Sequence, residues 1–289
     1  MKWSFVGKAG IRAGWSICIF LAIVVAVAIV EVAAVVAFGR RPSIDVPAPG
    51  PMFVVETLQC LPVIAATVLM GLIEKRPFRS YGYGGGRVVI KFLGGAAVGL
   101  IAMGSLVGTL WLCHLLVFKG FAIHGPETIG FGLFWAATFC LVGVFEESLF
   151  RGYVQATLTR GINFWWGACI TSALFVLAHA TNPGETPLGL LAVGAAGLTF
   201  ALSLRLTGSL WWAIGSHMAW DWAQSFLFGV ADSGMVAKGC LLMSHPAGSA
   251  LLSGGATGPE GSLFVLPVLA LMCLWLWLRW RKATPPPAS

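Results

Sequence analysis

Charged residues are scarce in this chain of 289 residues. Asp, Glu, Lys and Arg together make up 10% of it, against 58% hydrophobic residues. Soluble domains carry about 25% charged residues, so the composition excludes an ordinary soluble domain and favours a polytopic membrane protein. The net charge of +7 comes from basic residues that stand singly or in short groups between apolar blocks, without a basic face. We therefore expect no nucleic-acid partner.

Cysteine motifs are also lacking. The seven cysteines form no CxxC pair and no regular spacing, which excludes a cysteine-based zinc or redox motif. They are expected to act as small hydrophobic residues in helices. The first apolar run exceeds 20 residues and has no small-residue cleavage signature, which favours a retained first helix over a signal peptide.

Long apolar runs dominate what is present. A membrane-spanning helix needs about 20 mostly apolar residues, and eight such blocks lie near residues 14–38, 53–73, 92–117, 129–157, 164–181, 188–206, 209–230 and 262–280. The sequence thus predicts an all-α polytopic membrane protein with about eight transmembrane helices in one bundle. We expect a single transmembrane domain over residues 1–282 with its catalytic core in 129–230, followed by a disordered tail over 283–289.

The basic residues predict the orientation in the membrane. If the N-terminus is cytoplasmic, only Arg40, Arg41, Lys119 and Lys238 of the 18 basic residues fall on the opposite side. The positive-inside rule then favours both termini in the cytoplasm. The pattern indicates an integral protein of a bacterial inner membrane, in contact with the lipid bilayer.

The first polar group inside an apolar block is Glu146, Glu147 and Arg151. Glu147 and Arg151 stand four apart, in the favourable acid-before-base order for an ion pair on a helix. Glu146 is turned about 100° away and has no local partner, so it is the better candidate for a reagent, with the pair as its support. The alternative is a charge cluster at the membrane boundary.

Two further pairs stand four apart on later blocks. Phe175 and His179 share one helical face, and so do His217 and Asp221. A histidine is the natural proton acceptor near neutral pH, although a lone intramembrane histidine can also be a hydrogen-bonded packing residue. His217 and Asp221 can likewise be a simple polar pair within one helix.

Convergence of these helices would create a hydrolytic site. Glu146 and His179 could deprotonate a water molecule, while His217 and Asp221 could hold an oxyanion or a metal ion. The same four side chains could also bind Zn²⁺ with an open position, so metal-free and zinc mechanisms both remain open. Other polar residues fall near predicted helix ends or loops and are expected to be solvated: Glu56, His114, His124, Glu127, Glu185, Asp232 and His245.

The ordered motifs EExxxR, FxxxH and HxxxD, over residues 146–221, carry a family resemblance. The chain resembles the type II CAAX prenyl proteases, also called the CPBP or ABI family of intramembrane endopeptidases. The resemblance implies that Glu146 and His179 activate water and that His217 and Asp221 fill the oxyanion-stabilising or metal-holding places. It also implies a peptide or protein substrate at the membrane.

One position departs from the family pattern. Prenyl-protein processing members usually have asparagine where this chain has Asp221, and a carboxylate donates no hydrogen bond unless it is protonated. The departure favours a metal-holding or histidine-orienting role, and it also leaves open a non-catalytic immunity or scaffold protein. Intramembrane Glu and His could also relay protons in a transporter, although no internal repeat supports that alternative.

Overall fold

The computed structural model describes residues 6–7, 10–37 and 48–281. The predicted tail over 283–289 lies outside the described residues, and so do Lys2, Lys8, Arg40 and Arg41, which entered the orientation argument. Within the described ranges the chain is mostly helical, as the apolar blocks predict.

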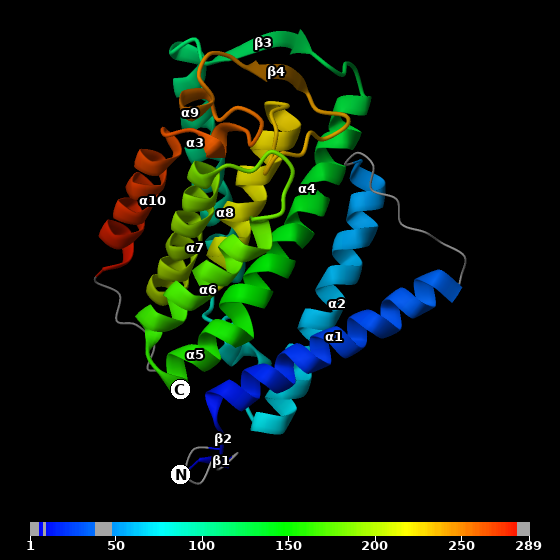
Figure 1. Cartoon of the computed structure of the whole chain (residues 1–289), viewed down its shortest axis with the longest axis vertical. Helices are drawn as coiled ribbons and strands as arrows, with labels where there is room; N and C mark the ends of the chain where they lie inside the picture. The colour runs from blue at the N-terminus through cyan, green and yellow to red at the C-terminus, as the bar shows by residue number, and fades with distance from the viewer. Residues whose placement is uncertain (1–5, 8–9, 38–47, 282–289) are drawn as a thin grey trace.

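The helices form one bundle, with α1 crossing it obliquely beside α2 (Figure 1). Their bounds are α1 Ala13–Ala37, α2 Pro49–Glu74, α3 Val88–Leu112, α4 Glu127–Glu147, α5 Gln155–Gly161, α6 Phe164–His179, α7 Pro187–Thr207, α8 Trp211–Trp222, α9 Ala250–Ser253 and α10 Val265–Trp280. Local signals set several of these ends. Asn163 and Thr186 cap α6 and α7 by accepting backbone N–H groups, and Gly208 ends α7 in the left-handed conformation.

The prediction of a helical membrane protein is confirmed. In the described part of the chain, five helical stretches are long and apolar enough to cross a membrane: α1, α2, α3, the stretch Glu127–Gly161 and α7. Helices α6 and α10 are shorter apolar helices, and α8 has 12 residues. Each of the eight predicted blocks overlaps one of these helices, while eight complete spans stay a prediction.

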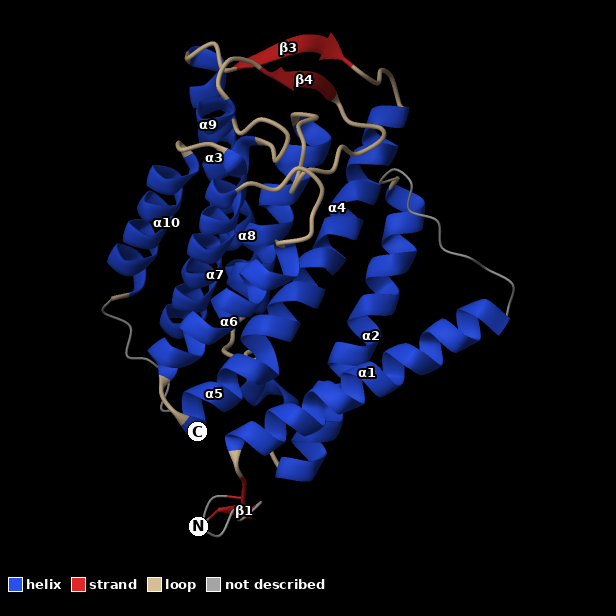
Figure 2. Ribbon diagram, viewed as in Figure 1, coloured by secondary structure: helices blue, strands red, loops and turns tan. Residues whose placement is uncertain are grey.

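Two short antiparallel sheets accompany the helices (Figure 2). Strands β1 Val6–Gly7 and β2 Gly10–Ile11 precede α1, and β3 Leu116–Phe121 pairs with β4 Leu242–Pro246 at the other end of the bundle. The predicted block 92–117 is therefore displaced towards the C-terminus and runs past the end of the helix. Helix α3 ends at Leu112, and His114 turns the chain with a positive φ of 60°.

Two helices that carry the polar motifs, α4 and α8, continue into π-helical turns. The turn η2, Ser148–Val154, follows Glu147 directly and contains Gly152 with a non-helical ψ of −113°. The turn η3, Ala223–Leu227, follows α8 two residues after Asp221. Single π-turns inside helices are frequent at functional sites. The block 129–157 was predicted as one continuous helix. Its regular α-helix ends at Glu147, within the EExxxR motif.

Glycines hold α8 directly against α3. A Cβ on Gly95 would lie 2.0 Å from the Trp212 carbonyl oxygen, and one on Gly99 would lie 2.1 Å from that of Ser216. On the other side of the contact, a Cβ on Gly215 would lie 2.1 Å from the Phe92 carbonyl oxygen. Small residues four apart are the sequence pattern of such close helix contacts in membranes. This contact fixes the helix that carries His217 and Asp221.

Candidate functional site

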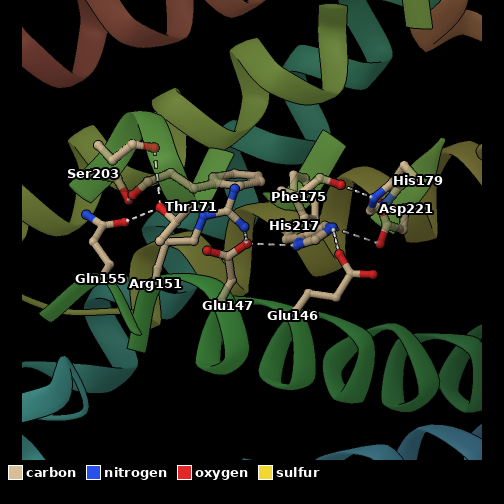
Figure 3. A network of polar contacts seen from close by, with 12 residues as sticks. Glu146, Glu147, Arg151, Gln155, Thr171, Phe175, His179, Ser203, His217 and Asp221 are labelled. Atoms are coloured by element: carbon tan, nitrogen blue, oxygen red, sulfur yellow. Dashed lines mark hydrogen bonds and ion pairs between the residues drawn. The ribbon is translucent and has the colours of Figure 1, made fainter. Parts of the chain in front are cut away.

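The predicted site residues meet in one cavity of about 410 Å³ inside the bundle. Glu146 comes from α4, His179 from the end of α6, and His217 and Asp221 from α8. Figure 3 shows Glu146, His179 and Asp221 grouped around His217. Three helices that are distant in the sequence therefore bring two carboxylates and two imidazoles to one space.

The predicted ion pair within α4 and its extension is present. Arg151 Nη1 donates to Glu147 Oε1 over 3.2 Å, and both side chains are fully buried. Glu147 Oε1 also lies 3.2 Å from His217 Nδ1. A proton on Nδ1 donates to this carboxylate, which leaves Nε2 of His217 on the cavity side. Glu147 thus links the buried arginine to the histidine of another helix.

Two carboxylates approach the cavity side of His217. Glu146 Oε2 and Asp221 Oδ2 each lie 3.6 Å from His217 Nε2. These distances allow ion pairing and exceed those of a good hydrogen bond. Glu146 Oε2 is buried and has no hydrogen-bond partner among the described residues. Glu146 Oε2, Asp221 Oδ2 and His217 Nε2 are therefore close to one another but form no hydrogen bonds with one another.

Aromatic rings enclose the imidazole of His217 and the guanidinium behind it. The ring of Phe200 stacks on His217 at 5.2 Å between centroids, and Phe175 meets it edge-on at 6.3 Å. Arg151 lies over the Phe175 ring at 4.3 Å, a favourable cation–π contact. Phe175, predicted as a supporting residue, therefore separates Arg151 from the cavity and packs against both histidines.

His179 occupies the last position of α6. Its Nδ1 lies 2.9 Å from the Phe175 carbonyl oxygen one turn earlier. A proton on Nδ1 donates there, which leaves Nε2 with its lone pair as the proton-accepting atom. No hydrogen bond or ion pair joins His179 to Glu146 among the described residues, so the two groups share the cavity without direct contact.

Three more carboxylates line the cavity, and sequence reasoning missed their place there. Glu56 was expected to be solvated but is 8% exposed, in the first half of α2. Asp232 was likewise expected in a solvated loop, yet it lines the cavity together with Glu260 of the turn η4 Pro259–Gly261. An acidic residue within the apolar block 53–73 was the available signal for Glu56. The loop residues carry no comparable signal.

The two loop carboxylates are held in place by serines. Ser233 donates to Glu260 Oε1 from its backbone nitrogen at 2.6 Å and from its hydroxyl at 2.9 Å. Ser225 donates its hydroxyl to Asp232 Oδ2 at 3.0 Å. Burial raises the pKa of both carboxyl groups, and the nearby Asp221 carboxylate raises that of Asp232 further. The loop end of the cavity therefore favours protonated carboxyl groups or a cation.

The predicted zinc alternative finds no matching arrangement of donors. In the part of the chain that the structure describes, no group of three His, Cys, Asp or Glu side chains is placed to hold a metal ion. Nδ1 of His179 points to a backbone carbonyl and Nδ1 of His217 to Glu147, which leaves one nitrogen on each ring. The residues as arranged do not fit a zinc site.

Comparison with known families adds to this geometry. Residues 128–223 match the family model described as type II CAAX prenyl endopeptidase Rce1-like. This part of the chain is Rce1-like. The resemblance inferred from EExxxR, FxxxH and HxxxD is thereby confirmed at the level of the family. Neither a curated protein nor a solved structure matches the chain.

The Rce1-like segment runs from the start of α4 to the first residue of η3. It contains Glu146, His179, His217 and Asp221, whereas Glu56 and Glu260 come from the flanking parts of the chain. The cavity is therefore lined partly by residues of the Rce1-like segment and partly by residues outside it. Together with the long apolar helices, the match of this segment supports an integral membrane protein.

Proposed function

We propose that the protein is an intramembrane endopeptidase in which Glu146 and His179 activate a water molecule. The observation that carries this proposal is the shared cavity. Glu146 has a buried oxygen without a hydrogen bond and lines the same cavity as the two histidines. Water and a peptide carbonyl can meet such groups inside a membrane only where a polar cavity admits them.

In this mechanism Glu146 accepts a proton from water while the water oxygen attacks the peptide carbonyl carbon. His179 assists through Nε2, because its Nδ1 is directed to the Phe175 carbonyl oxygen. The protonated Glu146 then donates its proton to the leaving amine as the C–N bond breaks. General acid–base catalysis by such a group contributes about 10²–10⁴ in rate.

His217 supplies the positive charge for the oxyanion. Glu147 and Asp221 stand on opposite nitrogens of its ring, at 3.2 and 3.6 Å, and both carboxylates favour the imidazolium form. The imidazolium Nε2–H points into the cavity, where it can donate to the tetrahedral oxyanion. Asp221 acts here through His217, a role that a carboxylate can fill where an asparagine would donate directly.

The substrate under this proposal is a peptide or protein embedded in or attached to the bilayer. The basic residues support a bacterial inner-membrane location with both termini in the cytoplasm. The residue pattern does not require the substrate to be prenylated.

The test is cleavage by full-length protein in lipid nanodiscs, with a library of membrane-anchored peptides analysed by mass spectrometry. Glu146→Gln keeps the size of the side chain and removes its basicity, so cleavage should fall at least about 100-fold. Glu127→Gln is the matched control, because Glu127 is exposed at the start of α4, and it should cleave like the wild type.

Equal cleavage by the wild type and Glu146→Gln would refute the proposed base. The second candidate function is that of a non-catalytic immunity or scaffold protein. It is favoured by Asp221, because prenyl-protein processing members of the family usually have asparagine at this position. That function predicts peptide binding without cleavage in the wild type, and binding that survives both Glu146→Gln and His179→Ala.

A further inference from the structure

The cavity has a strongly asymmetric charge. Its lining contains five carboxylates, Glu56, Glu146, Asp221, Asp232 and Glu260, and no lysine or arginine. The chain as a whole has a net charge of +7, so its cations are placed elsewhere. Arg151 does not line the cavity; it pairs with Glu147 and lies over the ring of Phe175.

Glu56 is the member of this set whose charge the protein compensates least. It is 8% exposed, and Gln59 of the same helix donates to its Oε1 over 3.1 Å. Its other oxygen, Oε2, has no hydrogen bond or ion pair with any described residue. A buried carboxylate without a cation is unfavourable, and a cation that enters beside it restores the balance.

The surroundings of Glu56 suit a long cationic side chain. Met52 of α2 and Phe139 and Val142 of α4 line the same cavity, and helices α2 and α4 lie side by side (Figure 1). Such apolar walls can contact the methylene groups of a lysine or arginine while the charged end reaches a carboxylate.

We propose that Glu56 determines specificity by binding a lysine or arginine side chain of the peptide substrate close to the scissile bond. This inference rests on the proposed function, because it assigns a substrate class to the same cavity. Glu56 touches the substrate and not the reacting atoms, so its loss should change selectivity more than chemistry.

The experiment uses three membrane-anchored reporter peptides that are identical except at one position beside the bond that the library identifies as cleaved. The position holds lysine, norleucine or glutamate. Wild-type protein in nanodiscs should cleave the lysine peptide with a kcat/KM at least about tenfold above that of the norleucine peptide, and the glutamate peptide should be the slowest.

Glu56→Gln should reduce the ratio of kcat/KM between the lysine and the norleucine peptide to near one. Exposed Glu127→Gln should keep the wild-type ratio. Two outcomes overturn the inference: equal kcat/KM for lysine and norleucine peptides scanned through every position around the cleaved bond, or an unchanged ratio in Glu56→Gln.

A binding measurement separates this inference from the proposed function. Fluorescence anisotropy of the same labelled peptides reports their affinity whether or not they are cleaved. A lysine preference in binding that Glu56→Gln abolishes, with no cleavage by the wild type, would support the cation subsite and refute the peptidase. The absence of any lysine preference in binding and in cleavage would refute the subsite alone when Glu146-dependent cleavage is present.

Discussion

Arg151 and Glu147 provide a quantitative test of the buried network. Both side chains are fully buried and pair over 3.2 Å. Arg151→Met preserves apolar contact with Phe175 but removes the guanidinium that pairs with Glu147, and Glu147→Gln leaves Arg151 charged and without its ion-pair partner. Removal of one partner from a buried pair costs about 3–5 kcal/mol, so each single variant should lose about that much stability.

The double variant Glu147→Gln/Arg151→Met contains neither buried charge. Its loss should be smaller than the sum of the single losses by about 2–3 kcal/mol, the coupling expected for two residues in direct contact. The assay is reversible denaturation by SDS in mixed micelles, followed by tryptophan fluorescence. Losses that add within about 0.5 kcal/mol would show that the pair is not coupled and would refute the reasoning.

Two further outcomes follow from other contacts. Gly99→Val would place a Cβ 2.1 Å from the Ser216 carbonyl oxygen and should destabilise the protein by about 3 kcal/mol or more. The control is Gly104→Val on the same helix, which meets nothing within 4 Å and should cost far less stability. The same SDS assay compares the two variants, and equal losses of stability would contradict the close helix contact. Burial raises the pKa of Glu260, so the native state holds that proton more tightly than the unfolded state does, and stability should fall as pH rises above about 4.3 towards the native pKa. Glu260→Gln, whose amide oxygen still accepts from Ser233, should flatten this fall in denaturation midpoints measured between pH 4 and 8, and an unchanged slope would exclude Glu260 as its source.

Much of the helical framework could be predicted because hydrocarbon demands long apolar segments. The block 14–38 corresponds to α1, Ala13–Ala37, and 188–206 corresponds to α7, Pro187–Thr207. The ion pair of Glu147 with Arg151 was predictable for a similar reason, since four residues make slightly more than one helical turn. Patterns that repeat along one helix are visible in a sequence.

Features that depend on contact between distant segments were not predictable in the same way. The π-turn after Glu147 leaves no periodic signature in the residues Ser148–Val154. The sheet of β3 and β4 joins strands more than 100 residues apart, and its own residues look like helix end and loop. The Gly95 and Gly99 pair was a readable signal for a close helix contact, but only the fold identifies α8 as the partner.

The loops carried the least information about the site. A loop carboxylate such as Asp232 looks solvated in the sequence, because burial depends on where the loop folds. The structure returns the loops after α8 to the cavity, where Ser233 holds Glu260 in place. Glu56 differs from these loop residues, because an ionisable residue within an apolar block indicates a functional role.

The direct backbone contact of α3 with α8 has a mechanical consequence. With carbonyl oxygens of one helix lying where a side chain of the other would begin, neither helix can slide or rotate on its partner without a clash. The two helices must therefore travel as one rigid body, and His217 and Asp221 keep their height relative to α3 during any motion. Entry of a polypeptide into the cavity then requires displacement of the other walls, to which α2, α6 and the segment around Glu260 belong.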